Sequence, residues 1–163
     1  ATRRGTDPSG PVPGWTLSRI VWALALAWEK RRKLRRAVRA RNRGLVVICD
    51  RYPQAQVPGV NDGPLLTRWH HHASAVARAV ARWESAPYEW ASRHPPDLVI
   101  KLLVSPDVTL KRKPGMRRDD VARRIATVRS LMYPPTVQVV ELDANAPLER
   151  VGEQVKRAVW ERL

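Results

Sequence analysis

GLVVICDRYP, residues 44–53, is the stretch on which the fold prediction depends, because five consecutive apolar residues follow a glycine and end at an adjacent acid and base. An unbroken apolar run of this length is typical of a strand that is buried on both faces, as in a parallel sheet covered by helices. Ligands of such sheets bind beyond the carboxyl ends of the strands. Asp50 and Arg51 follow that end, where a carboxylate can hold a metal ion and a guanidinium can grip a phosphate. A strand-end salt bridge or a turn is the alternative role of this pair.

Two further apolar runs predict strands at residues 97–104 and 137–142, the second of which ends at Asp143. Helices are expected around these strands, at residues 15–41, 65–92 (interrupted near Pro87), 106–113, 119–132 and 147–163. This alternation favours the α/β class, with three layers in which a parallel sheet is flanked by helices. Residues 1–14 are rich in Pro, Gly, Ser and Thr, which predicts a flexible lead-in, so the α/β domain is expected over residues 15–163.

The composition favours anionic partners, because 30 Lys and Arg against 15 Asp and Glu give a formal net charge of +15. Nucleotides, nucleic acid and an acidic surface all fit this charge, and a genome-wide bias toward arginine is the alternative explanation. Cys49 is the single cysteine, so no intrachain disulfide can form, and a reduced, cytoplasmic setting is expected. The longest apolar segment, residues 20–28, is shorter than the roughly 20 residues that span a bilayer, so no membrane partner is expected.

The predicted helix 15–41 combines an apolar face with the strongest charge run of the chain. The apolar positions recur at helical spacing, at Ile20, Leu24, Ala27, Leu34 and Val38. Arg31 falls in the middle of this face, so its side chain either snorkels to solvent or points into a substrate cleft. Basic residues are dense between Lys30 and Arg43 and are spread around the helix, which favours a solvated face. A nucleic-acid patch is the alternative, although no aromatic residues are interleaved with the charges.

Several motifs in a fixed order resemble the thymidylate kinase-like P-loop nucleotide kinases over residues 20–163. They are Asp50-Arg51-Tyr52 after a strand, PPDLVI at 95–100 followed by SPDV at 105–108, a basic lid-like segment, and a strand that ends at Asp143-Ala144 with Pro147-Leu148 and a closing helix. The resemblance implies an ATP- and Mg²⁺-dependent kinase. Its product would form by transfer of the ATP γ-phosphate to a nucleoside monophosphate or a related acceptor.

The resemblance also implies roles for residues near the first predicted strand. Asp50 would help to organise Mg²⁺ and the acceptor phosphate, and Arg51 would clamp the phosphate of the nucleoside monophosphate. Tyr52 would lie near the acceptor sugar or base. A base on the preceding helix would match the family's substrate-contacting arginine; Arg31 is the first candidate, and Lys30 and Arg32 are the alternatives.

Further residues are placed at the ATP side by the resemblance. Arg112 would lie against the adenine, and Arg117 and Arg118 would be lid residues that close over the phosphates. Arginines from several segments suit phosphoryl transfer, which depends mainly on positioning and on neutralising charge. For Arg117 and Arg118, exposed loop charges are the alternative interpretation.

Two features depart from the family pattern. The GxxxxGK[ST] loop that holds the donor phosphates does not occur, and no Gly-Lys pair exists in the 163 residues. The family's first two strands are therefore expected to be absent, which makes this the C-terminal portion of a P-loop kinase fold or a chain without catalysis. The loop at 53–64 also lacks the family's Ser and Ala-Tyr-Gln pattern, so Asn61 and Asp62 are the candidate substitute contacts to the acceptor, with a simple turn as the alternative.

Two functions from different classes follow. In the first, the chain carries the acceptor site and lid of a nucleotide kinase, completed by an N-terminal segment or a homodimer partner, and by itself transfers little phosphate. In the second, it is a non-catalytic basic binding or scaffold module that engages nucleic acid or another anionic partner.

Overall fold

A computed structural model describes residues 17–163, and the expected lead-in at 1–14 lies outside them. The chain divides into two compact units, Ala1–Arg93 and His94–Leu163, which are called here the helical unit and the sheet unit. Among the described residues, no helix is both long enough and apolar enough to cross a membrane.

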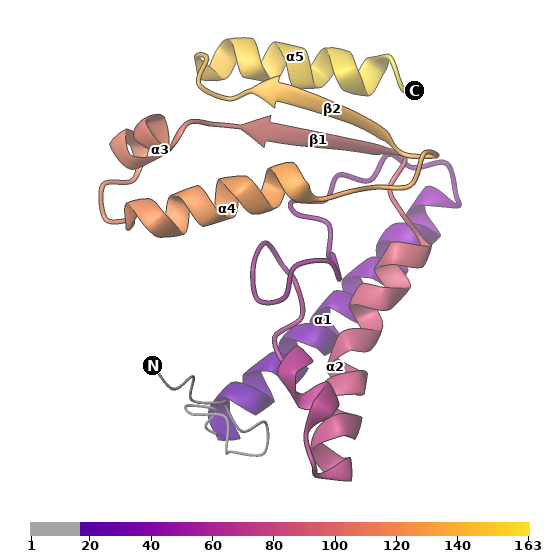
Figure 1. The fold of residues 1–163 in the computed structure, drawn as a ribbon. Coiled ribbons are helices and arrows are strands. Elements are labelled where there is room, and N and C mark those ends of the chain that lie inside the picture. The colour runs from indigo at the N-terminus through magenta and orange to yellow at the C-terminus, as the bar shows by residue number, and fades with distance from the viewer. Residues whose placement is uncertain (1–16) are drawn as a thin grey trace. The chain divides into compact units, whose positions relative to one another are not determined.

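The helical unit is built on two helices, α1 (Leu17–Arg41) and α2 (Ala75–Arg93), which pack along each other (Figure 1). The contact uses small residues, since Ala23 of α1 and Ala81 of α2 are completely buried and join Leu66 in one apolar cluster. Small side chains let two helix axes approach closely. The 3-10 helix η1 (Thr67–His71) follows Leu66 and packs on α2. The predicted helix at 15–41 is therefore confirmed over residues 17–41, and residues 15 and 16 lie outside the described part of the chain.

Two predictions for the helical unit are wrong. Residues 45–49 do not form a strand, and Leu45 and Ile48 are 61% and 88% exposed. A strand requires a neighbour that takes its backbone hydrogen bonds, and no described strand pairs with this segment. Pro87 does not interrupt α2, because it is buried between Glu84 and Ala91 on the packed face of the helix. The packing there outweighs the cost of a proline in a helix interior, which loses one backbone hydrogen bond and crowds the preceding turn at a cost of about 3 kcal/mol.

The sheet unit has two parallel strands, β1 (Leu98–Leu103) and β2 (Gln138–Asp143), paired in register from Leu98 opposite Gln138 to Leu103 opposite Asp143. The connection between them contains α3 (Pro106–Arg112) and α4 (Arg118–Ser130), and α5 (Leu148–Trp160) follows β2. Figure 1 shows α4 alongside β1 and α5 alongside β2, on opposite sides of the strand pair. The α/β class and the parallel pairing are confirmed, with two strands among residues 17–163 in place of the three expected.

Local sequence signals explain these elements. Ser105 caps α3, since its hydroxyl oxygen accepts a hydrogen bond from the Val108 N–H at 3.4 Å, and Pro106 opens the helix where no N–H is needed. Asp119 or Asp120 is the N-cap that the sequence predicts for α4, but Arg117 occupies that position and the two acids lie in the first turn of the helix. Val121 of α4 and Val151 of α5 are buried, and they anchor the two helices of this unit.

Candidate functional site

A pocket of about 280 Å³ lies at the carboxyl ends of β1 and β2, inside the sheet unit. Its lining is contributed by the ends of both strands and by α4: Leu103, Val104, Ser105, Arg129, Glu141, Leu142, Asp143 and Asn145. This is the edge at which parallel sheets bind ligands. The mixture of apolar walls with a few polar groups suits a small organic ligand that carries hydrogen-bonding atoms.

Hydrogen bonds fix the turn at the rim of this pocket. Asp143 accepts from both the backbone N–H and the side-chain amide of Asn145, at 2.9 and 2.6 Å. The Asn145 side-chain oxygen in turn accepts from the Ser105 N–H at 2.9 Å. The Ala144 N–H donates to the Leu103 carbonyl at 2.7 Å. These bonds tie the ends of the two strands together, so the rim is ordered before any ligand arrives.

Arg112, the predicted adenine contact, lies at this rim. Its guanidinium donates to the carbonyl oxygens of Ala144 at 2.9 Å and Ala146 at 3.4 Å. These two bonds use the edge of the planar group and join the end of α3 to the turn after β2. The faces of a guanidinium held in this way can still stack on an aromatic ring.

The two predicted lid arginines differ in their surroundings. Arg118 forms an ion pair with Asp107 at 2.7 Å, and both side chains are about two-thirds exposed. Arg117 is exposed at the N-cap of α4. Exposed pairs contribute at most about 1 kcal/mol, so an anion can compete with Asp107 for Arg118 at little cost.

Lys101 is a polar residue beside the pocket that is not among the candidate site residues from the sequence. Its side chain is 9% exposed within β1, and its Nζ lies 3.2 Å from the Arg129 carbonyl oxygen and 3.4 Å from the Glu141 carboxylate. Arg129 and Glu141 both line the pocket. The available signal was an acid and a base at the same register position of two apolar strands, 101 and 141.

The predicted residues at 50–52 lie in the helical unit. Asp50 and Arg51 are exposed, and Arg51 adopts a left-handed backbone conformation with φ 60°. Tyr52 is half-buried, and its hydroxyl donates to the Ala91 carbonyl at 3.5 Å. Burial raises the pKa of Tyr52 to about 12, so the hydroxyl keeps its proton and acts as a donor. Tyr52 therefore attaches this segment to the end of α2.

The loop that follows is folded around the buried side chain of Gln54. Its amide nitrogen donates to the carbonyls of Val57 and Val60, both at 2.8 Å, and its oxygen accepts from the Val57 N–H at 2.7 Å. Asn61 and Asp62 then adopt left-handed conformations, with φ 45° and 61°. Consecutive residues of this kind cost free energy and persist where their surroundings impose them. We call residues 53–64 the glutamine loop.

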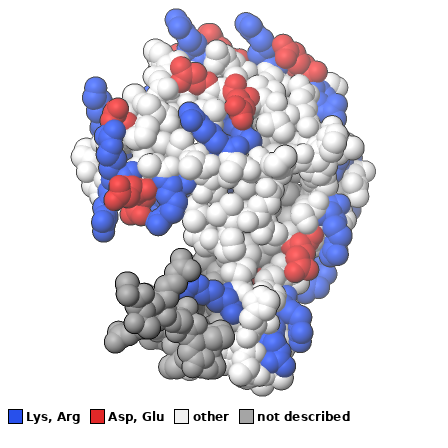
Figure 2. Space-filling view, in the orientation of Figure 1, with Lys and Arg blue, Asp and Glu red and all other residues white. Residues whose placement is uncertain are grey.

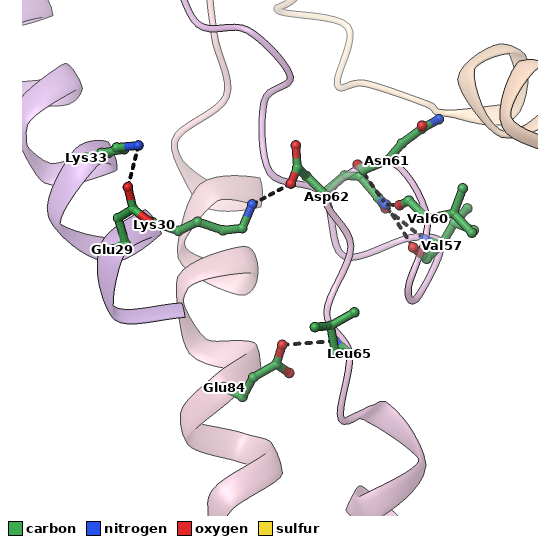
Figure 3. Close-up of polar contacts among 10 residues, drawn as sticks. Glu29, Lys30, Lys33, Val57, Val60, Asn61, Asp62, Leu65 and Glu84 are labelled. Carbon is green, nitrogen blue, oxygen red and sulfur yellow. Dashed lines mark hydrogen bonds and ion pairs between the residues drawn. The ribbon is translucent and has the colours of Figure 1, made fainter. Parts of the chain in front are cut away.

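Lys30, the alternative to Arg31, contacts the glutamine loop. Its Nζ lies 2.6 Å from the Asp62 carboxylate and 5.8 Å from the centre of the Tyr88 ring, and its side chain is 19% exposed (Figure 3). Arg31 is exposed, which agrees with the alternative in which its side chain snorkels to solvent, and its role toward a substrate stays a prediction. The buried face of α1 is centred on Ala27, Lys30 and Leu34, and one residue turns a helix by about 100°.

Glu84 of α2 completes the polar groups beneath this loop. It is completely buried, and its carboxylate accepts the Leu65 N–H at 2.9 Å and the Leu66 N–H at 3.4 Å. Burial raises the pKa of Glu84, and the two N–H groups lower it only in part. The sequence signal was present but unused, because Glu84 lies at helical spacing between the buried Ala81 and Tyr88.

The structure thus brings together Lys30 and Asp62 in one unit, and Arg112 with the turn after β2 in the other. The convergence of Asp50 and Arg51 with Arg112, Arg117 and Arg118 on one substrate stays a prediction. Within residues 17–163, no group of three or more His, Cys, Asp or Glu side chains is arranged to hold a metal ion. The role of Asp50 toward Mg²⁺ also stays a prediction.

Comparison with known proteins points to a class whose members bear ATP-binding names. The chain is 27% identical over 149 residues to "Uncharacterized ATP-binding protein YghR", both from Escherichia coli K12 and from the O6:H1 strain CFT073, covering 88% of this chain and 58% of YghR. It is 28% identical over 157 residues to "Uncharacterized ATP-binding protein YghS" of Escherichia coli K12, covering 96% of this chain and 64% of YghS. The chain therefore spans about three-fifths of these relatives. No family model matches it, and no solved structure matches it.

Proposed function

We propose that this chain is part of an ATP-binding, nucleotide kinase-like protein, in which the sheet unit receives the adenine nucleotide and the helical unit receives the phosphate acceptor. The observation that carries the proposal is the pocket of about 280 Å³ at the carboxyl ends of two parallel strands, beside a turn to which Arg112 is hydrogen-bonded. The ATP-binding names of YghR and YghS support the nucleotide part. The order of the motifs supports the kinase part.

In the sheet unit, we assign the nucleotide base to the pocket rim. The guanidinium of Arg112 would stack on the adenine, because its edge is already held by the carbonyls of Ala144 and Ala146. Asn145 and Ser105 supply polar atoms at the same rim. Arg117 and Arg118 would meet the phosphates, with Arg118 leaving the exposed Asp107 to do so.

In the helical unit, we assign the acceptor phosphate to Arg51 and the acceptor's other groups to Tyr52 and the glutamine loop. Lys30 would take the role of the family's helix-borne base, since Asp62 holds it against the loop. Transfer would break the bond between the ATP β–γ bridging oxygen and the γ-phosphorus and form a bond from an acceptor phosphate oxygen, giving ADP and a nucleoside diphosphate.

We infer Mg²⁺ as a companion of ATP from the resemblance to the nucleotide kinases. Mg²⁺ keeps several waters and takes one or two protein carboxylates together with substrate phosphates. Asp50 is exposed and could be such a ligand, whereas an all-protein site would need more groups. Mg²⁺ would neutralise phosphate charge during transfer.

Equilibrium dialysis with labelled ATP tests the nucleotide part. We expect the chain to bind ATP weakly, because it lacks the GxxxxGK[ST] loop, and we expect Arg112→Ala to weaken binding about tenfold. Arg150→Ala removes another exposed arginine, in α5, and is the matched control, which should change the affinity less than twofold. Equal effects of the two substitutions would refute the assignment of Arg112.

Phosphate transfer is tested separately. We expect little ATP turnover with any nucleoside monophosphate for the 163-residue chain alone. Turnover at a typical kinase rate of about 1–100 s⁻¹ would contradict this expectation and would show that residues other than Arg117 and Arg118 hold the donor phosphates.

A further inference from the structure

We propose that the outward stripe of α1 is a binding surface for single-stranded nucleic acid, a function separate from the nucleotide pocket. The stripe consists of Trp28, Arg32, Arg35, Arg36 and Arg39; each lies three or four residues from another member, so the five share one side of the helix. All five are exposed. The buried residues Ala23, Ala27 and Leu34 lie on the opposite side, so packing against α2 leaves this stripe uncovered.

The charge of this stripe is not balanced within the helix. Glu29 is the single acid of α1, and it is already paired with Lys33 at 2.6 Å. Arg32 with Arg36, and Arg35 with Arg39, are like charges four residues apart, which repel each other on a helix. Basic side chains near a helix C-terminus are favourable, yet this effect is confined to the last turn and covers only Arg39 of the stripe. An anionic partner would remove the repulsion. Lys and Arg also outnumber Asp and Glu on the molecular face drawn in Figure 2.

An aromatic ring is built into the same stripe, contrary to the sequence-based expectation of charges without aromatics. The Arg32 guanidinium lies over the Trp28 ring, 4.5 Å from its centre, and Trp28 is 52% exposed. Trp22, a further turn and a half toward the N-terminus, is 63% exposed. Nucleic-acid bases stack on indole rings and on arginine planes, whereas the phosphates pair with the neighbouring charges.

These features favour a single strand over other anionic partners. The phosphates of a duplex could pair with the arginines, but the bases of a duplex are already stacked on each other and would not stack on the Trp28 ring. A helix that lies in a membrane surface needs an apolar face opposite its charged face, and the apolar face of α1 is occupied by packing. The stripe from Trp28 to Arg39 is about 17 Å long, which suits a few nucleotides.

The test uses fluorescein-labelled dT15 and rU15 with the whole chain, measured by anisotropy between 50 and 300 mM NaCl. Both strands should bind, and the logarithm of the affinity should fall with the logarithm of salt by about 0.7 per phosphate contacted. The triple variant R35Q/R36Q/R39Q should weaken binding at 50 mM NaCl at least tenfold and reduce this slope by about 2. Trp28→Ala should weaken binding about threefold to tenfold without changing the slope.

The matched control is R150Q/K156Q/R157Q, which removes the same charge from exposed positions of α5 and should change the affinity less than threefold. Circular dichroism and thermal melting check that every variant is folded, and ATP affinity should be the same in both triple variants. An equal loss of affinity in the two triple variants would mean that binding depends on net charge alone, which would overturn the proposal. Tighter binding of a 15-base-pair duplex would overturn it as well, and so would binding to phosphatidylserine vesicles without binding to dT15 or rU15.

Discussion

The ion pair between Lys30 and Asp62 offers the sharpest test of how the glutamine loop is held, because a second pair in the same helix has the same length and a different environment. Lys30 and Asp62 are 2.6 Å apart with side chains 19% and 32% exposed. Lys33 and Glu29 are also 2.6 Å apart, but their side chains are 74% and 52% exposed (Figure 3). The two pairs therefore share their distance and differ in burial and in sequence separation, because Lys33 and Glu29 are four residues apart on one helix and Lys30 and Asp62 are 32 residues apart.

Burial sets the expected magnitudes. Exposed pairs four residues apart on a helix contribute about 0.3–0.5 kcal/mol, which is the coupling energy expected for Lys33 and Glu29. The Lys30–Asp62 pair lies between this case and a fully buried pair, whose disruption costs about 3–5 kcal/mol. We therefore expect a coupling energy of about 1–2 kcal/mol for Lys30 and Asp62.

Double-mutant cycles measure both couplings by urea denaturation. The first cycle combines Lys30→Met with Asp62→Asn, and the second combines Lys33→Met with Glu29→Gln. Such cycles isolate the pair from the other effects of each substitution. A Lys30–Asp62 coupling no larger than that of Lys33 and Glu29 would refute the view that this pair fastens the glutamine loop to α1.

Two further predictions concern the same unit. Gly63→Ala should destabilise the helical unit by about 2–4 kcal/mol, because a Cβ there would collide with the Val57 carbonyl oxygen. The control is Gly115→Ala, whose Cβ meets open space and which should change the free energy of unfolding by less than about 0.5 kcal/mol. Similar values for both substitutions would contradict the close packing of the loop. Burial raises the pKa of Glu84 above its ordinary value of 4.5, so the folded chain binds this proton more tightly than the unfolded chain does. The free energy of unfolding of the wild type, relative to that of Glu84→Gln, should therefore fall as the pH rises above 4.5 toward the folded-state pKa. Urea titrations between pH 4 and 7 measure this difference, and a constant difference would contradict the raised pKa of Glu84.

Elements that depend on neighbours in the sequence were predictable. The Ser105-Pro106 start of α3 follows from the chemistry of a single helix turn. β1 and β2 follow from short apolar runs that contain neither proline nor glycine. The parallel pairing follows as well, since the helices between the strands return the chain to the same end of the sheet.

Features that depend on distant partners were not predictable. The apolar run at 45–49 carries the composition of a buried strand, yet whether it forms one depends on a neighbouring strand that composition does not reveal. Lys30 and Arg31 are adjacent, and which of them faces the packed side of α1 depends on how α1 is rotated about its axis against α2, to within one residue. Gln54 organises its loop through backbone carbonyls, whose positions no pattern of side chains specifies.

Hydrogen–deuterium exchange with and without ATP tests the central claim most directly, because it reports where the nucleotide acts on the backbone. We predict slower exchange at the ends of β1 and β2 and in the turn that Arg112 holds, at residues 103–105 and 143–147, and a smaller change in the Arg112→Ala variant at the same ATP concentration. ATP-dependent protection that leaves these two segments unchanged in the wild type would contradict the claim that the carboxyl ends of the parallel strands bind the nucleotide.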